Sequence, residues 1–299
     1  MKKSICFWFS FVFIAFLYAG KVDTIQIMSY SMHKQVKCVV ITPESYLINK
    51  NSYSVIYLLH GYAGNYAQWI RTAPQLKQKT DEIQSIIVCP DGGYDSWYFN
   101  SDKDTNVKYE TFISKELVNY IDSNYRTIAN RNFRAITGLS MGGHGSMYLA
   151  IKHSGVFGTC GATSGGVDLT PFPNNWGIKN VLGDTSCCSA NWVNNSVINM
   201  VDLLHNHELS IILDCGTEDF FLDVNRRLHK KLLNLRISHD YIERSGAHNS
   251  NYWKNSIDYQ LLFFKKCFSS HAANKVLGID KKITKVDLPT TTTISFAHD

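Results

Sequence analysis

The segment Phe133–Gly145, FRAITGLSMGGHG, holds a serine in a setting that suits nucleophilic chemistry. A short apolar run leads into Gly138-Leu139-Ser140-Met141-Gly142, and a helix-like segment follows. A serine at the apex of such a strand-to-helix turn holds its hydroxyl above the sheet edge, and the flanking glycines leave room where a Cβ would collide with backbone. The pattern predicts that Ser140 is a nucleophile. Its alternative interpretation is a plain glycine-rich turn.

A serine hydroxyl needs a base within hydrogen-bonding reach, usually a histidine that a carboxylate orients. In folds built around this turn the chain order is Ser, acid, His, and each group follows the C-terminal end of a strand. Asp219 follows the strand-like run 210–215, with Glu218 as the runner-up and a helix N-cap as its alternative role. His248 lies in a glycine-containing loop before the last helical pattern. We therefore predict Ser140, Asp219 and His248 as the catalytic residues.

Ester or amide cleavage by a serine also needs two backbone N–H groups that face the developing oxyanion. We expect one from Met141, the residue after the nucleophile, and one from the loop His60–Asn65, HGYAGN, with Tyr62 as the best single donor. In this loop His60 is interpreted as a structural residue that fixes the loop.

The elements that must position these groups alternate along the chain. Apolar or alternating runs predict eight strands, at 24–29, 35–42, 54–59, 85–89, 133–137, 158–163, 210–215 and 239–243. Helical patterns lie between them, and the first two strands read as an antiparallel hairpin. This order predicts an α/β domain over residues 21–268, with a mostly parallel sheet and helices on both faces. Residues 165–195, rich in Gly, Pro, Asn and Ser, are expected to form an insertion over the active edge.

The two ends of the chain differ from this domain. Lys2 and Lys3 precede an apolar run, Ile5–Leu17, which predicts a signal peptide over residues 1–20. The run is short for a membrane span, so we expect a secreted or periplasmic protein without stable membrane insertion once the signal is removed; a signal anchor is the competing interpretation. Residues 269–299 are polar and are expected to form a weakly ordered tail.

Composition narrows the choice of partner only slightly. The 299 residues carry a net charge of +5, and they show no basic run or nucleic-acid motif, so no nucleic-acid partner is expected. The 8 cysteines form no C-x-x-C pair, and neither a metal site nor a disulfide framework is predicted. Cys89, Cys160 and Cys215 read as core residues, whereas Cys187 and Cys188 lie in a polar stretch.

Several segments together resemble the Putative esterase family, which includes S-formylglutathione hydrolase (esterase D), tributyrin esterases, the feruloyl and acetyl xylan esterases of carbohydrate esterase family one, and mycolyltransferases. The resemblance rests on YLLHGYAGNYAQW (57–69), YETFISKELVNYID (109–122), GLSMGGHGSMYLA (138–150), CGTEDFF (215–221) and GAHNSNYW (246–253). It implies an α/β-hydrolase fold and a Ser–Asp–His esterase without a cofactor, which maps onto Ser140, Asp219 and His248. Ala247 departs from the family, where a glycine commonly precedes the histidine.

The resemblance and the signal peptide together favour a secreted serine carboxylesterase. Its expected substrate is a small-molecule or polysaccharide ester, such as a short-chain acyl, acetyl or feruloyl group on carbohydrate. An S-formylglutathione hydrolase-like thioesterase, a mycolyltransferase-like acyltransferase and a non-enzymatic carbohydrate-binding protein are the alternatives. Candidates for contact with the substrate, each taken singly more typical of core, are Tyr62, Trp69, Trp97, Trp176 and Trp253.

Overall fold

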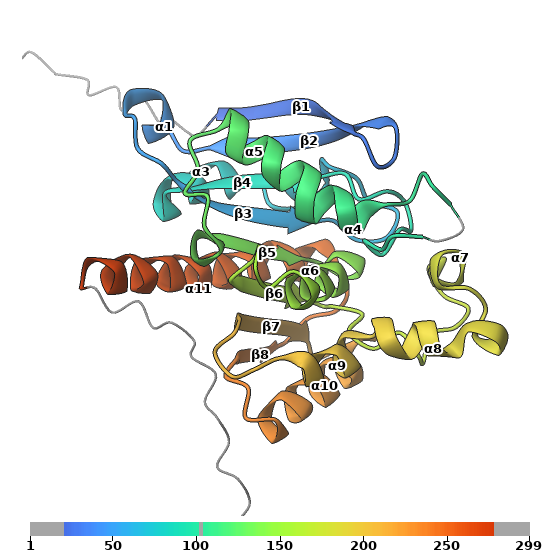
Figure 1. Ribbon diagram of the computed structural model, residues 1–299. Helices are drawn as coiled ribbons and strands as arrows, with labels where there is room; N and C mark the ends of the chain where they lie inside the picture. Colours follow the sequence, from blue (N-terminus) through green and yellow to red (C-terminus); the bar gives the residue numbers. More distant parts are fainter. Residues whose placement is uncertain (1–20, 102–103, 278–299) are drawn as a thin grey trace, which may run out of the picture.

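A single eight-stranded sheet runs through the computed structural model, which describes residues 21–101 and 104–277 (Figure 1). The strand order is β1-β2-β4-β3-β5-β6-β7-β8. The strands are β1 (Lys21–Ser29), β2 (Lys34–Thr42), β3 (Ser54–Leu59), β4 (Ser85–Pro90), β5 (Arg134–Gly138), β6 (Thr159–Thr163), β7 (Ser210–Gly216) and β8 (Asp240–Arg244). β2 pairs antiparallel with both β1 and β4, and the other pairs are parallel. The predicted α/β-hydrolase architecture is confirmed.

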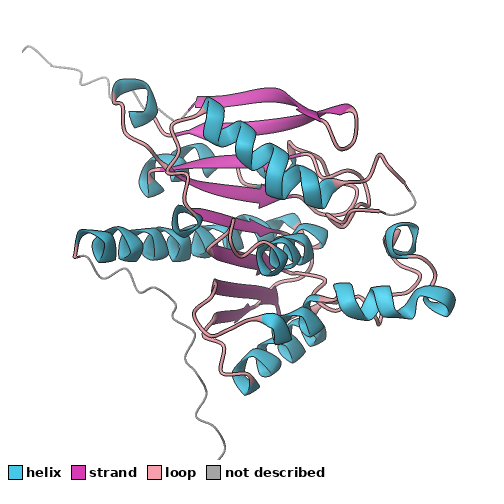
Figure 2. Ribbon diagram, in the orientation of Figure 1, coloured by secondary structure: helices cyan, strands magenta, loops and turns pink. Residues whose placement is uncertain are grey.

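Helices lie between the strands and cover both faces of the sheet (Figure 2). They are α1 (Ser45–Ile48), α2 (Gln68–Thr72), α3 (Leu76–Ile83), α4 (Tyr109–Thr111), the π-helical η1 (Phe112–Leu117), α5 (Val118–Asn124), the 3₁₀ turn η2 (Arg131–Phe133), α6 (Met141–Lys152), α7 (Ile178–Leu182), α8 (Thr185–Asn195), α9 (Val197–Met200), the 3₁₀ turn η3 (Val201–Leu203), α10 (Leu222–Asn234) and α11 (Ser250–Val276).

The central strand β3 shows why the sheet is covered on both sides. All six of its residues are buried, as expected of a nearly continuous apolar strand. Successive side chains of a strand point to opposite faces, so Val55, Tyr57 and Leu59 join one core with α5, α6 and α10. Ile56 and Leu58 join a second core with α2, α3 and α11. The sheet thus separates two hydrophobic layers.

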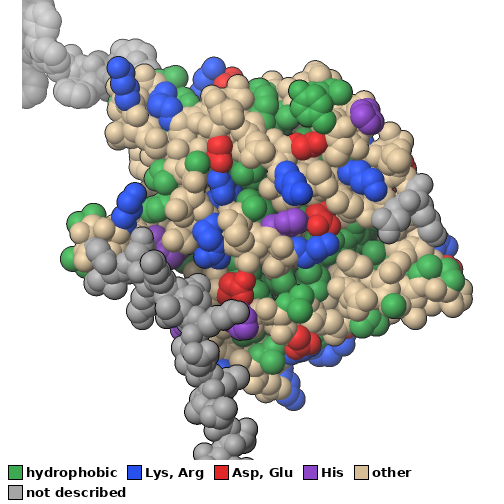
Figure 3. Space-filling view, viewed as in Figure 1, with side chains coloured by type: hydrophobic (Ala, Val, Ile, Leu, Met, Phe, Trp, Pro, Cys, Tyr) green, Lys and Arg blue, Asp and Glu red, His purple; other side chains and the backbone are tan. Residues whose placement is uncertain are grey.

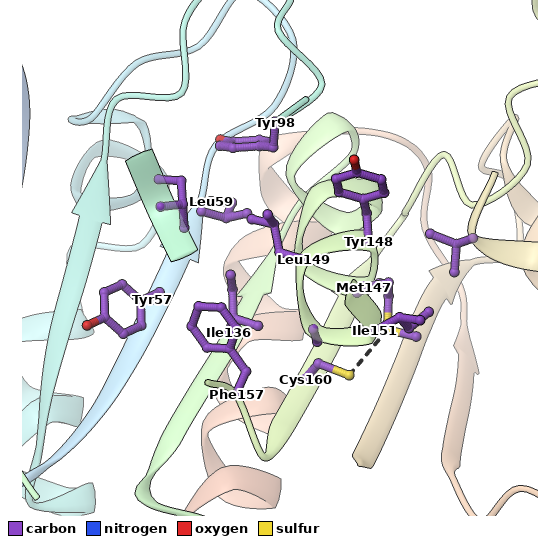
Figure 4. Close-up of a cluster of buried hydrophobic side chains, with 14 of the residues drawn as sticks. Tyr57, Leu59, Tyr98, Ile136, Met147, Tyr148, Leu149, Ile151, Phe157 and Cys160 are labelled. Carbon is purple, nitrogen blue, oxygen red and sulfur yellow. Dashed lines mark hydrogen bonds between the residues drawn. The ribbon is translucent and has the colours of Figure 1, made fainter. Parts of the chain in front are cut away.

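Helix α6, which follows the candidate nucleophile, is held almost entirely inside the first core. Eleven of its 12 residues are buried. Figure 4 shows Met147, Leu149 and Ile151 of this helix in the same cluster as Ile136 of β5 and Cys160 of β6. Phe157 meets the Tyr57 ring edge-on, with centroids 5.8 Å apart. A helix buried on nearly every side cannot shift without opening the core, so its first residue is firmly placed.

The insertion after β6 is helical in part. α7 and α8 stand beyond the carboxyl ends of the strands, at the right of Figure 1. Trp192, in the last turn of α8, is buried, and its Nε1–H donates to the Gly183 carbonyl oxygen at 2.9 Å. The sequence predicted this insertion but not its helices, because they are short and polar.

Surface charges on the face seen in Figure 3 are mixed, with Lys and Arg interspersed among Asp and Glu. Among the charged side chains of the described residues, Lys152 pairs with Glu110 at 3.0 Å and Arg226 pairs with Glu243 at 2.8 Å. This pattern agrees with the modest net charge of +5.

The predicted signal peptide and most of the predicted tail lie outside the described residues. We expected the domain to end at residue 268 and a weakly ordered tail to begin at residue 269, but helix α11 continues to Val276. None of the helices within the described ranges is long and apolar enough to cross a bilayer.

Candidate active site

Ser140 occupies a strained turn between β5 and α6. Its backbone has φ 56° and ψ −118°, a conformation that residues other than glycine seldom adopt. A Cβ on Gly142 would lie 2.4 Å from the Leu59 carbonyl oxygen, and one on Gly138 would lie 2.5 Å from the Gly142 carbonyl carbon. Both flanking positions therefore require glycine. The Ser140 N–H donates to the Thr163 carbonyl oxygen at 3.0 Å, which ties the turn to β6.

His248 lies in the loop after β8 and contacts both other candidate residues. Its Nε2 lies 2.9 Å from Oγ of Ser140. Its Nδ1 lies 2.9 Å and 3.0 Å from the two carboxylate oxygens of Asp219. Because an ionised carboxylate only accepts hydrogen bonds, Nδ1 carries the proton and the Nε2 lone pair faces the serine hydroxyl. This tautomer is the one that can remove the serine proton.

Asp219 is held by the loop after β7. Its side chain is 0% exposed, and its Oδ1 accepts the Phe221 N–H at 2.8 Å. The backbone of this loop is also bonded to the loop of His248, since the Glu218 N–H donates to the Gly246 carbonyl oxygen at 2.9 Å. Glu218, the runner-up acid, is exposed, and the carboxylate bonded to His248 is that of Asp219. The structure therefore brings together the three residues that the sequence selected.

The loop after β3 approaches the serine closely. A Cβ on Gly61 would lie 3.4 Å from Cβ of Ser140, so the loop that continues into Tyr62 packs directly against the nucleophile residue. Within the described part of the chain, neither the N–H of Tyr62 nor that of Met141 donates to a protein acceptor. Two unused donors beside a nucleophile can receive an oxyanion.

His60 fixes this loop by a pair of hydrogen bonds. The Gly92 N–H donates to its Nε2 at 2.7 Å, and its Nδ1–H donates to the Gly61 carbonyl oxygen at 2.8 Å. Burial lowers the pKa of His60 below its ordinary value, which favours the neutral ring that both bonds require. The structure thus gives His60 the positional role that the sequence suggested.

Aromatic rings surround the imidazole of His248. Phe220 lies 4.2 Å from it between ring centroids, and Trp176 stacks on Phe220 at 5.4 Å with an angle of 18° between planes. Phe220 is 52% exposed. In the loop after β3, the ring centroid of Tyr62 lies 5.0 Å from that of the exposed Tyr94. The sequence missed Phe220 and Tyr94, although the position of Phe220 directly after the acid was a usable signal.

The tryptophans proposed as substrate contacts need correction. Trp69 is 1% exposed, packs in the core with α11 and donates from Nε1 to the Leu59 carbonyl oxygen at 2.9 Å. Trp97 is also 1% exposed and donates to the Trp176 carbonyl oxygen at 3.0 Å. Trp253 is 9% exposed and meets the His248 ring edge-on at 5.0 Å, so it supports the base. Of the four, only Trp176 is partly exposed. It belongs to a group of rings at the site, called here the aromatic rim, that also includes Phe220, Tyr62 and Tyr94.

In the part of the chain that the structure describes, no three His, Cys, Asp or Glu side chains gather as a candidate metal site. The site consists of an imidazole in contact with Ser140, a buried carboxylate in contact with that imidazole, and the backbone N–H groups of Met141 and Tyr62. Such a set can carry a proton and stabilise an oxyanion, which is the chemistry of acyl transfer through serine.

Comparison with known proteins agrees with this site. The model of the family described as Putative esterase matches residues 29–264. An esterase of Mycobacterium tuberculosis strain H37Rv is 37% identical over 134 residues, which are 44% of this chain and 29% of that protein. An acetyl esterase of Caldicellulosiruptor saccharolyticus is 24% identical over 222 residues, covering 70% of this chain and 82% of the relative. The match therefore spans less than a third of the mycobacterial protein.

Solved structures show the same arrangement of strands and helices. A ferulic acid esterase superposes with a TM-score of 0.73 and 27% sequence identity, covering 83% of this chain and 98% of the other.

Proposed function

The chain belongs to the Putative esterase family, and we propose that it is a secreted serine carboxylesterase that hydrolyses acyl esters of carbohydrate. The observation that carries the proposal is the contact between Nε2 of His248 and Oγ of Ser140 at 2.9 Å, with Asp219 bonded to the other ring nitrogen. In this proposal Ser140 is the nucleophile, His248 the general base and acid, and Asp219 the residue that orients the imidazole.

In the acylation step, Oγ of Ser140 attacks the ester carbonyl carbon while its proton passes to Nε2 of His248. The carbonyl oxygen becomes an oxyanion, which accepts hydrogen bonds from the N–H groups of Met141 and Tyr62. The tetrahedral intermediate then collapses, and the imidazolium gives its proton to the leaving alcohol. Asp219 stabilises the transient positive charge on the ring.

In the deacylation step, water takes the place of the leaving alcohol. His248 removes a proton from water, the hydroxide attacks the acyl carbonyl, and Ser140 leaves with the proton that the imidazolium returns. The carboxylic acid departs and the hydroxyl of Ser140 is regenerated. No redox change and no cofactor enter this cycle.

The substrate class is supported by the rim of the site and by the relatives. Trp176, Phe220, Tyr62 and Tyr94 offer ring surfaces on which a sugar or an aromatic acyl group can pack. Two of the similar proteins named above are an acetyl esterase and a ferulic acid esterase. Secretion is supported by the sequence of residues 1–20 alone.

The proposal is tested with a fluorophosphonate probe and a set of esters. The wild-type protein should be labelled and should hydrolyse p-nitrophenyl acetate, methyl ferulate or acetylated xylan oligosaccharides. Ser140→Ala should resist the probe and lose about 10⁴- to 10⁶-fold in kcat/KM. Equal labelling of both proteins would refute the nucleophile, and turnover of thioesters alone would refute the carbohydrate ester.

A further inference from the structure

Two adjacent cysteines lie outside the candidate active site, in helix α8 of the insertion. The sulfur atoms of Cys187 and Cys188 are 2.8 Å apart. Cys187 is exposed and Cys188 is half-buried. Neither residue has a part in the ester chemistry proposed above.

The backbone at this pair departs from helical geometry. Cys188 has φ −133° and ψ 29°, and the helix is kinked there. In a regular α-helix, successive side chains diverge because each residue turns by more than a quarter of a circle. The kink brings the two thiols to the same side instead. Upstream, Asp184 caps the helix, with its side chain accepting the Ser186 N–H at 2.9 Å, so the turn that holds the pair is fixed on its N-terminal side.

The other described cysteines are in a different environment. Cys38, Cys89, Cys160 and Cys215 are buried, and burial raises the pKa of each of these thiols. Cys267 is half-buried and its pKa is raised for the same reason. Thiolate is the reactive form, so these five thiols are poor nucleophiles at neutral pH. Among the cysteines that the structure describes, Cys187 is the exposed one.

We propose that Cys187 and Cys188 form a reversible dithiol–disulfide pair that exchanges with small disulfides. The thiolate of Cys187 attacks one sulfur of a disulfide RSSR, which breaks the S–S bond and releases RSH after protonation. The Cys188 thiolate then attacks the Cys187 sulfur of the mixed disulfide and releases the second RSH. The two protein thiols lose two electrons and two protons, and RSSR becomes two molecules of RSH.

Geometry favours a labile bond over a permanent one. Adjacent Cα atoms are about 3.8 Å apart across a trans peptide, whereas disulfides usually join Cα atoms about 4.4–6.8 Å apart. The small ring that joins neighbouring residues is therefore strained, and strained, exposed disulfides are the readily reduced ones. The short distance between the two sulfur atoms offsets this strain during oxidation, because Cys188 already lies beside the sulfur that it must attack.

The pair can be followed on one peptide. Cleavage before aspartate releases residues 184–201, which contain Cys187 and Cys188 and no other cysteine. The full-length protein is incubated with oxidised glutathione, and its remaining thiols are blocked with iodoacetamide. After cleavage, the mass of the peptide is measured by mass spectrometry. The wild-type peptide should lose the mass of two hydrogen atoms and carry neither glutathione nor the blocking group, and dithiothreitol should restore two blockable thiols.

Variants that lack one of the two thiols test whether both are needed to form the disulfide. Cys187→Ser and Cys188→Ser cannot close the ring, so oxidation should stop at a mixed disulfide, most readily on Cys187 in the Cys188→Ser protein. A Cys267→Ser control should behave as the wild type. Wild-type peptide that carries glutathione, stays fully blockable or links two chains on a non-reducing gel would overturn the proposal. These measurements need no ester substrate, so they are independent of the proposed function.

Discussion

Oγ of Ser140 lies 2.9 Å from Nε2 of His248, although 108 positions separate the two residues in the chain. Ser140 follows β5 and His248 follows β8, and strands β6 and β7 lie between these two in the sheet. The contact is possible because parallel strands end at one edge and their loops converge there. Any change in the order or spacing of these four strands would separate the base from the hydroxyl.

The role of Asp219 is tested by Asp219→Asn. The amide keeps the size of the side chain and can still accept the Phe221 N–H, but it no longer holds the proton on Nδ1 of His248. We expect kcat to fall on the order of 10⁴-fold with little change in stability. The control is Glu218→Gln at the exposed neighbouring position, which should keep wild-type kinetics. A comparable loss in both variants would contradict the assignment.

The close packing of the nucleophile turn is tested by Gly142→Ala. The new Cβ would lie 2.4 Å and 2.6 Å from the carbonyl oxygens of Leu59 and His60, which are backbone atoms and cannot rotate away. We expect the free energy of unfolding in urea to decrease by about 1–3 kcal/mol. Gly155→Ala, where no atom lies within 4 Å of the added Cβ, is the matched control and should change stability by less than about 0.5 kcal/mol.

The aromatic rim is tested by Phe220→Ala. Removing the ring takes away one face against which a flat group can pack, beside His248 and Trp176. We expect kcat/KM for methyl ferulate to fall about 3- to 10-fold, and that for p-nitrophenyl acetate to change less. Leu203→Ala removes another exposed side chain, 72% exposed in η3, and should leave both values unchanged. An equal loss on the two substrates would indicate a disturbed histidine instead of a lost contact.

Buried His144 predicts how stability depends on pH. Desolvation lowers its pKa from an ordinary 6.5 to about 4. The unfolded chain therefore binds a proton between these values while the folded chain does not, so stability falls as the pH decreases from about 6.5 to about 4, by up to about 1.4 kcal/mol per pH unit. His144→Gln should show a shallower decrease in urea unfolding over this window.

Other groups set the background of that measurement. His60, whose pKa is lowered in the same direction, leaves some slope in the variant. The contacts of Glu110 with His153, Tyr148 and Lys152 lower its pKa from 4.5 to about 2, despite burial, so its contribution is lost only at more acidic pH. An unchanged slope in His144→Gln between pH 6.5 and 4 would show that the imidazole is not the group responsible.

The sequence was most informative where local chemistry and chain order agree. All eight predicted strands are present. Buried parallel strands such as β3 leave continuous apolar runs, whereas the antiparallel hairpin of β1 and β2 leaves an alternating pattern. Ser140, Asp219 and His248 could be selected because the fold prescribes their order and each follows a strand. Cys89, Cys160 and Cys215 are buried as predicted, since each lies in such a run.

Side-chain exposure was the least predictable property. Trp69 and Phe220 are both aromatic and both close to a motif, yet one is 1% exposed and the other 52%. Trp69 lies in helix α2 and packs in the second core, whereas Phe220 lies in the loop between β7 and α10, and such packing is a tertiary property. Helices α3, α7 and α8 were missed for a related reason, because short polar helices are stabilised by what they contact more than by their own periodicity.

The backbone bonds between the loops of Asp219 and His248 have a consequence for how this enzyme family can be altered. The Thr217 and Glu218 N–H groups hold the carbonyl oxygens of Arg244 and Gly246, so the carboxylate and the imidazole are carried on one bonded unit. Replacing only one of the two loops with that of a relative would misalign the carboxylate and the imidazole. Replacing both loops together would keep the contact between Asp219 and His248. Recombination between homologues should therefore tolerate a crossover before residue 210 far better than one between residues 219 and 248.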